Sequence, residues 1–169
     1  MEQKKSEDLS LSPHRRRVEA WREWLPTVWQ FNAFCTLHFH QAVPLDHARS
    51  RLWRFLTDMQ RHATIFDFNF YERPWSERID GVIIPEKIEY STHYHLLLQI
   101  PEYSQVISFY ENGPQIWKRI SKTGTFYIKE QTDPEEWKKI ISYATKESHK
   151  DLNYGEMILV RELWHRKTA

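Results

Sequence analysis

The sequence predicts an α+β fold in which a central, mostly antiparallel sheet of five strands is flanked by helices. Short apolar segments that alternate with polar residues or run uninterrupted are typical of strands, and longer segments with apolar residues every three or four positions are typical of helices. Their order along the chain is helix, strand, helix, three strands, short helices, strand and helix.

The first half of the chain begins with helical composition at residues 13–25, and we expect Pro26 to end this helix. Residues 31–40, FNAFCTLHFH, are rich in aromatic and β-compatible residues and predict a strand. Residues 44–61 predict an amphipathic helix with arginines on its polar side. Residues 65–72, IFDFNFYE, alternate as a half-buried strand does.

The second half begins with a predicted hairpin. Residues 78–90 continue the β pattern, and residues 92–100 follow after a tight connection, so we expect an antiparallel pair. The leucine run in the second strand indicates burial on both faces and hence a central strand. Residues 103–120 predict two short helices separated by a turn at residues 112–114, Asn-Gly-Pro. Residues 124–131 predict another strand.

The clearest helix signal covers residues 133–147. Asp133 is the expected N-cap, Pro134 takes the first helical position, and Glu136 is expected to close a capping box. Residues 156–160, EMILV, are a candidate edge strand.

Length and composition favour one domain at residues 14–169 after a flexible leader at residues 1–13. Because no apolar run is long enough to cross a membrane, and the N-terminus lacks the pattern of a signal peptide, we expect a cytoplasmic protein with no membrane partner. The single cysteine, Cys35, excludes an internal disulfide and a cysteine-based zinc cluster. The net charge of +1 means that nucleic-acid binding would require local basic patches.

The motif THYHLLL at residues 92–98 is the first candidate for chemistry. On a strand, His93 and His95 share one face with Cα atoms about 7 Å apart, so both imidazoles can reach one ion. A hard divalent ion favours a carboxylate as third ligand. The candidates are Glu86, Glu89 and Glu72, and Glu86 is preferred because an antiparallel hairpin brings it level with the histidines.

Chance provides an alternative, because nine histidines give about half a His-x-His pair at random, and a second pair exists at His38 and His40. Two histidines satisfied by hydrogen bonds at a sheet surface would need no ion. A second motif is Tyr143 and Lys146, whose spacing of three places them on one helix face. Its alternative is a core tyrosine beside a surface lysine.

In combination, these motifs resemble a known family. The strand FCTLHFH at residues 34–40, the His-Tyr-His motif and the downstream Tyr-x-x-Lys resemble, in order, the three motifs of the HUH endonuclease superfamily. The closest type is the single-tyrosine rolling-circle replication initiator. The resemblance spans residues 31 to about 150. It implies the HUH nuclease fold, which has a ferredoxin-like or RRM-like architecture, and a scaffolding and DNA-contacting role for the first strand.

The resemblance implies an enzyme that nicks and rejoins single-stranded DNA at an origin or hairpin. Tyr143 would attack a backbone phosphate and form a 5′-phosphotyrosine, with Mg²⁺ or Mn²⁺ held by His93, His95 and Glu86. Since a phenol has a pKa near 10, Lys146 would favour the phenolate or neutralise charge on the phosphate. Larger viral relatives carry a helicase domain after the nickase. We expect this chain to lack one, so a host helicase and polymerase are the expected partners.

DNA binding also requires basic side chains for phosphates, and the candidates are Arg49, Arg54, Lys118 and Arg119. Their alternative is a set of solvated helix faces. Other functions stay open: a non-catalytic single-stranded nucleic-acid-binding module of the same architecture, or a transposase or relaxase relative. The histidine spacing and the predicted helices argue against a non-haem iron oxygenase built in a jelly roll.

Overall fold

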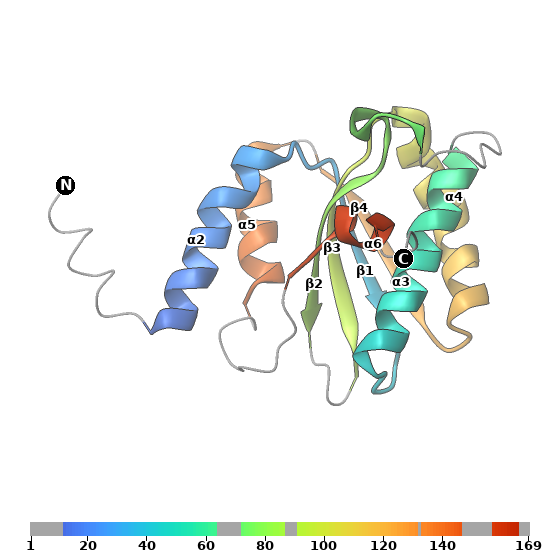
Figure 1. The fold of residues 1–169 in the computed structure, drawn as a ribbon, viewed down its shortest axis with the longest axis horizontal. Coiled ribbons are helices and arrows are strands. Elements are labelled where there is room, and N and C mark those ends of the chain that lie inside the picture. Colours follow the sequence, from blue (N-terminus) through green and yellow to red (C-terminus); the bar gives the residue numbers. More distant parts are fainter. Residues whose placement is uncertain (1–11, 64–71, 87–90, 132, 147–156, 166–169) are drawn as a thin grey trace, which may run out of the picture.

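A computed structural model describes residues 12–63, 72–86, 91–131, 133–146 and 157–165 (Figure 1). Within them, five strands form one sheet in the order β4-β1-β3-β2-β5, and all neighbouring pairs are antiparallel. Helices flank this sheet, which confirms the predicted α+β class. Of the predicted leader, residues 1–11 lie outside the described residues, whereas Ser12 caps the first helix and Pro13 begins it.

The strands are β1 (Ala33–His38), β2 (Asp80–Glu86), β3 (His93–Gln99), β4 (Thr125–Glu130) and β5 (Ile158–Leu159). The helices are α2 (Pro13–Val28), α3 (Leu45–Ala63), the short 3-10 helix η2 (Trp75–Glu77), α4 (Tyr103–Ile120), α5 (Pro134–Ala144) and α6 (Val160–His165). The predicted hairpin is confirmed as β2 and β3, and β3 is the middle strand of the sheet.

Close approach of the hairpin strands depends on Gly81. Its φ of +137° suits glycine, and a Cβ there would lie 2.1 Å from the Leu97 carbonyl oxygen. The resulting register places Glu86 directly opposite His93.

The two faces of the sheet carry separate apolar cores. Helices α3, α4 and α6 cover the face to which Leu96 and Leu98 belong, and their core includes Phe55, Phe109, Trp117 and Leu163. Helices α2 and α5 cover the face to which Leu97 belongs, and their core includes Leu25, Phe34, Val82, Trp137 and Ile141. Figure 1 shows α2 and α5 on one side of the sheet and α3 and α4 on the other.

Cys35 lies in β1 within the first of these cores and is fully buried. Burial in this apolar setting raises the pKa of its thiol well above the ordinary value.

The sequence predicts that Pro26 ends the first helix. This prediction is wrong, because α2 continues to Val28. The backbone N–H of Trp29 closes the last turn on the carbonyl of Leu25 at 3.3 Å. Since Leu25 and Trp29 both belong to the α2/α5 core, their burial outweighs the one hydrogen bond that proline cannot donate.

The predicted break at residues 112–114 is also wrong, because α4 is continuous through the Asn-Gly-Pro sequence. Gly113 faces β4, where an added Cβ would lie 2.8 Å from the ring of Phe126. Buried Phe109, Ile116 and Trp117 lie on the same helix face. Their packing offsets the cost of about 3 kcal/mol that an interior proline imposes on a helix.

The predicted strand at residues 65–72 lies outside the described residues except for Glu72, which is not in a strand. The candidate edge strand at residues 156–160 is present as the shorter strand β5. In α5, Asp133 is confirmed as the N-cap, since its Oδ1 accepts from the Glu135 N–H at 2.9 Å. The prediction of a capping box is wrong, because Glu136 pairs with Lys139 and the Asp133 N–H donates to the side chain of Gln131.

Candidate metal centre and nucleophile

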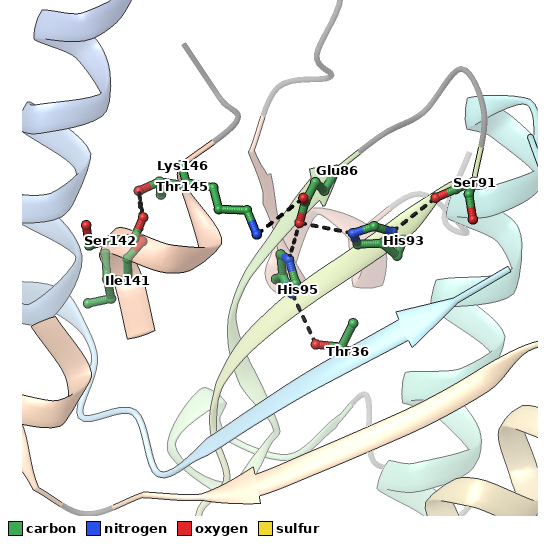
Figure 2. A network of polar contacts seen from close by, with 9 residues as sticks. All are labelled: Thr36, Glu86, Ser91, His93, His95, Ile141, Ser142, Thr145 and Lys146. Carbon is green, nitrogen blue, oxygen red and sulfur yellow. Dashed lines mark hydrogen bonds and ion pairs between the residues drawn. The ribbon is translucent and has the colours of Figure 1, made fainter. Parts of the chain in front are cut away.

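Three side chains converge where the β2–β3 hairpin closes (Figure 2). Glu86 ends β2 opposite His93, and His95 lies two residues along β3 on the same face. Oε2 of Glu86 lies 2.6 Å from Nε2 of His95 and 3.0 Å from Nε2 of His93. Of the three candidate glutamates, the structure therefore brings Glu86 to the histidines, while Glu89 lies outside the described residues.

We call Glu86, His93 and His95 the carboxylate–histidine trio. The exposed fraction of the side chain is 2% for Glu86 and His95 and 15% for His93. Burial raises the pKa of Glu86, but hydrogen bonds and charge attraction from His95 and His93 outweigh it and lower the pKa to about 2. Burial lowers the pKa of His95, although Glu86 opposes the change. The ionised carboxylate is the state of Glu86 that binds a cation.

Outer hydrogen bonds orient both imidazoles. Nδ1 of His93 lies 3.0 Å from the Ser91 carbonyl oxygen, to which it can only donate, so Nε2 of the neutral ring carries the lone pair. That lone pair faces Oε2 of Glu86. Because Nε2 of His93 and Oε2 of Glu86 are then both acceptors, a proton or a cation must lie between them. Nδ1 of His95 pairs with the hydroxyl of Thr36 at 3.1 Å. Partners of this kind fix the rings of metal-binding histidines.

The donor set could hold a divalent metal ion. The three ligand atoms all lie within 4.8 Å of one another. Two donors at right angles, each about 2.1 Å from an octahedral ion, are about 3 Å apart. The 3.0 Å separation between His93 and Glu86 matches this value, and the 2.6 Å separation between His95 and Glu86 would need to lengthen slightly. Two imidazoles and one carboxylate can bind several divalent transition-metal ions.

Tyr143 lies on the same side of the sheet as the trio. The centroid of its ring is 5.4 Å from that of His95 and 6.4 Å from that of Phe34. The residue is 51% exposed, so the alternative of a buried core tyrosine is wrong. The structure thus presents an accessible phenol beside the trio.

Lys146 connects the trio to Tyr143. Its Nζ lies 3.4 Å from Oε1 of Glu86 and 3.7 Å from the centre of the Tyr143 ring. Contrary to the sequence prediction, Lys146 lies beyond α5, which ends at Ala144. Its backbone N–H still donates to the Tyr143 carbonyl at 3.2 Å, and this turn keeps both side chains beside the trio.

Helix α2 holds the end of α5 in place. Nε of Arg22 donates to Oγ1 of Thr145 at 2.9 Å, and its Nη2 donates to the Ser142 carbonyl at 3.3 Å. The Thr145 hydroxyl in turn donates to the Ile141 carbonyl at 2.8 Å. Sequence reasoning missed Arg22, Thr145 and Thr36, since no local pattern marks a partner that is distant along the chain.

His38 and His40 lie beside the trio and are not part of it. The rings of His38 and His93 are 5.1 Å apart, and Nε2 of His38 pairs with the Ser91 hydroxyl at 2.6 Å. His40 pairs with the hydroxyl of Thr125 at 3.2 Å. The first strand therefore borders the site, as the resemblance led us to expect.

The four predicted DNA-binding residues do not surround the trio. Arg49 and Arg54 belong to α3, and Lys118 and Arg119 belong to α4, so all four lie on helices of the opposite face. Lys118 and Arg119 line a surface pocket of about 540 Å³ that Thr125 also lines. This second pair thus lies near β4, the edge strand next to β1.

Comparison with known proteins finds no matching family model, no matching curated protein and no matching solved structure. Among the helices that the structure describes, none has the length and apolar character needed to span a membrane.

Proposed function

We propose that this protein is a metal-dependent endonuclease that nicks and rejoins single-stranded DNA through a 5′-phosphotyrosine at Tyr143. The observation that carries the proposal is the half-exposed Tyr143 ring packed against His95 of the trio. A nucleophile, a cation next to it and ligands for a divalent ion then lie on the same face of the sheet.

Tyr143 supplies the nucleophile of a transesterification. Its phenol loses a proton, and the oxygen attacks a backbone phosphorus. The bond from phosphorus to the 3′-oxygen breaks, and that oxygen takes up a proton and leaves as a 3′-hydroxyl. The downstream strand stays attached to Tyr143 through its 5′-phosphate. Since one phosphodiester replaces another, a later attack by a 3′-hydroxyl rejoins DNA without ATP.

Lys146 and the trio supply the electrostatics of this step. The Lys146 ammonium, in contact with the Tyr143 ring, would neutralise negative charge that develops on the phosphate. Mg²⁺ or Mn²⁺ bound by Glu86, His93 and His95 would polarise the phosphate and carry part of its developing charge. The hydrogen bonds of His95 with Thr36 and of His93 with Ser91 hold both imidazoles in a fixed orientation.

The biological setting that fits this chemistry is rolling-circle replication of a plasmid or phage. The substrate would be a single-stranded origin or hairpin, and a host helicase and polymerase would open and extend the strand. These partners imply a cytoplasmic protein. A transposase or relaxase would use the same chemistry on a different element.

A second candidate is a binding module without catalysis. Tyr127 on β4 is 57% exposed and pairs in register with Thr36 of β1. Its aromatic ring therefore lies on the sheet surface. Such rings stack on single-stranded bases. This function would not need Tyr143 or the trio.

Labelled single-stranded oligonucleotides incubated with Mn²⁺ test the proposal. Wild type should cleave and leave a protein-linked product in denaturing gels, whereas Tyr143→Phe should form no adduct. Tyr103→Phe is the matched control, since Tyr103 is an exposed tyrosine on α4. Cleavage that persists in Tyr143→Phe refutes the covalent mechanism. A wild type that binds but never cleaves favours the binding module.

A further inference from the structure

A continuous row of rings crosses the sheet face that carries the trio. Starting from Tyr143, successive ring centroids are 5.4 Å apart to His95, 5.5 Å to His93, 5.1 Å to His38 and 4.0 Å to His40. The proposed nucleophile is at one end of the row, and an exposed histidine is at the other. We call His93, His38 and His40 the histidine row.

Neighbouring residues of β4 leave the histidine row accessible. Thr125 pairs with His38, and Tyr127 pairs with Thr36, so their side chains share its face. Both are exposed, although α2 and α5 cover other parts of this face. An extended strand can therefore reach the row from solvent.

Beyond His40, the row meets a surface pocket that two basic residues help to line. The ring of His40 pairs with Thr125, which lines the pocket of about 540 Å³ together with Lys118 and Arg119. The neighbouring Gly124 lacks space for a Cβ, which would lie 2.7 Å from the His38 carbonyl oxygen. Because the start of β4 lies this close to the end of β1, the pocket begins where the histidine row ends.

In-line displacement gives the row a direction. The attacking and leaving oxygens lie on opposite sides of the phosphorus, so for a phosphate held at the trio and attacked by Tyr143 the leaving 3′-oxygen would point away from Tyr143, towards the row. The nucleotides joined to that oxygen are those on the 5′ side of the scissile phosphate. Histidine rings stack on bases and donate to phosphates, and Lys118 and Arg119 neutralise phosphates.

We propose that the 5′ flank of the substrate runs from the trio along the histidine row into the pocket beside Lys118 and Arg119. This inference rests on the proposed function, because the direction comes from attack by Tyr143. It assigns DNA contacts to His38 and His40. It also gives the predicted pair Lys118 and Arg119 a place in the path, even though α4 covers the opposite face.

Two half-oligonucleotides test the direction once the nick has been mapped by sequencing the cleaved products. One ends in the 3′-hydroxyl of the nick, and the other begins just after it. Fluorescence anisotropy with Tyr143→Phe protein measures their affinities without cleavage. His40→Ala should weaken binding of the first several-fold, and Lys118→Ala with Arg119→Ala should weaken it about tenfold. Affinity for the second should not change.

Arg54→Ala is the matched control, since Arg54 is an exposed arginine of α3 outside this path, and it should leave both affinities unchanged. Equal losses for both half-oligonucleotides, or losses confined to the second, overturn the inference. Unchanged melting temperatures in all variants would show that the effects are local.

Failure of the proposed function is visible separately, as the absence of any adduct with wild type. In that case a labelled dT20 strand replaces the mapped site. Weaker dT20 binding in His40→Ala and in Lys118→Ala with Arg119→Ala, but not in Arg54→Ala, still supports the path as a single-strand track. Binding that ignores these substitutions overturns it.

Discussion

Arg22 of α2 donates a hydrogen bond to Thr145 at 2.9 Å, although 123 residues separate them in the chain. Thr145 caps α5 between Tyr143 and Lys146, so the first described helix braces the turn that carries both proposed catalytic residues. The second donation, from Arg22 to the Ser142 carbonyl, satisfies part of the exposed end of α5.

Replacing Arg22 by alanine should loosen this turn. We expect a loss of about 1 kcal/mol in the free energy of unfolding and a drop of about 2–4 °C in melting temperature, with a larger loss in adduct formation. Arg16→Ala, an exposed arginine on the same helix, is the control for circular dichroism and adduct assays. Combining Arg22→Ala with Thr145→Val should be non-additive, and full additivity would argue against the contact.

Glu86→Gln should abolish binding of Mn²⁺, because it removes the anionic ligand and leaves two imidazoles. In wild type, Mn²⁺ at 100 times its dissociation constant should add about 2.7 kcal/mol to the free energy of unfolding. Glu72→Gln is the control, because Glu72 is not part of the trio. Mn²⁺ should stabilise this variant as much as it stabilises wild type. Calorimetric titration gives the affinities, and an undiminished Mn²⁺ effect in Glu86→Gln would exclude the trio as the binding site.

Acid should destabilise the metal-free protein in two stages. The unfolded chain takes up a proton on histidine near pH 6.5, whereas the lowered pKa of His95 delays this in the folded state, so stability decreases as pH falls below that value. The contribution of Glu86 is complete above its ordinary pKa of 4.5 and disappears as pH falls towards about 2.

Urea denaturation in the presence of a chelator measures this dependence. Wild type should lose more stability than Glu86→Gln between about pH 5 and about pH 3, because glutamine has no proton to gain. Parallel pH profiles for the two proteins would contradict the assignment of this loss to Glu86.

Thr36→Val should reduce metal affinity without unfolding the protein. The substitution keeps the side-chain shape and removes the hydroxyl that pairs with His95. Loss of such an outer partner costs about 10–100-fold in affinity. Thr125→Val serves as the control, since Thr125 contacts His40 and not the trio. Equal affinities for the two variants would show that Thr36 does not orient His95.

Gly113→Ala should destabilise the protein, although alanine is normally the better helix former. At an unconstrained helix position the exchange stabilises by about 1 kcal/mol. Here the new methyl group would lie 2.8 Å from the Phe126 ring, and overpacking of this kind costs about 1–3 kcal/mol. Phe126→Leu should restore part of the loss in the double variant. A raised melting temperature in Gly113→Ala would show that α4 can move away from β4.

Sequence could anticipate the carboxylate–histidine trio because local rules determine it. Alternation on β3 places His93 and His95 on one face, and antiparallel pairing of β2 with β3 brings Glu86 level with them. The spacing of Tyr143 and Lys146 likewise follows from one helical turn and survives although α5 ends between them. Each of these relationships involves residues that are near neighbours in the chain.

Features that depend on distant contacts could not be anticipated. Proline normally ends a helix, but Pro26 and Pro114 lie inside helices because burial of neighbouring apolar residues outweighs the local cost. The face on which α3 and α4 pack depends on how the chain crosses the sheet, so the basic residues could not be positioned relative to the trio. The brace from Arg22 to Thr145 has no local signature for the same reason.

Buried Cys35 makes this chain convenient for spectroscopy. The thiol is the single one in 169 residues, is fully enclosed and has a raised pKa, so maleimide dyes should not modify the folded protein. One cysteine introduced at an exposed position would then be the sole attachment point for a fluorophore. Energy transfer from that dye to a labelled oligonucleotide could follow individual molecules without first removing a native cysteine.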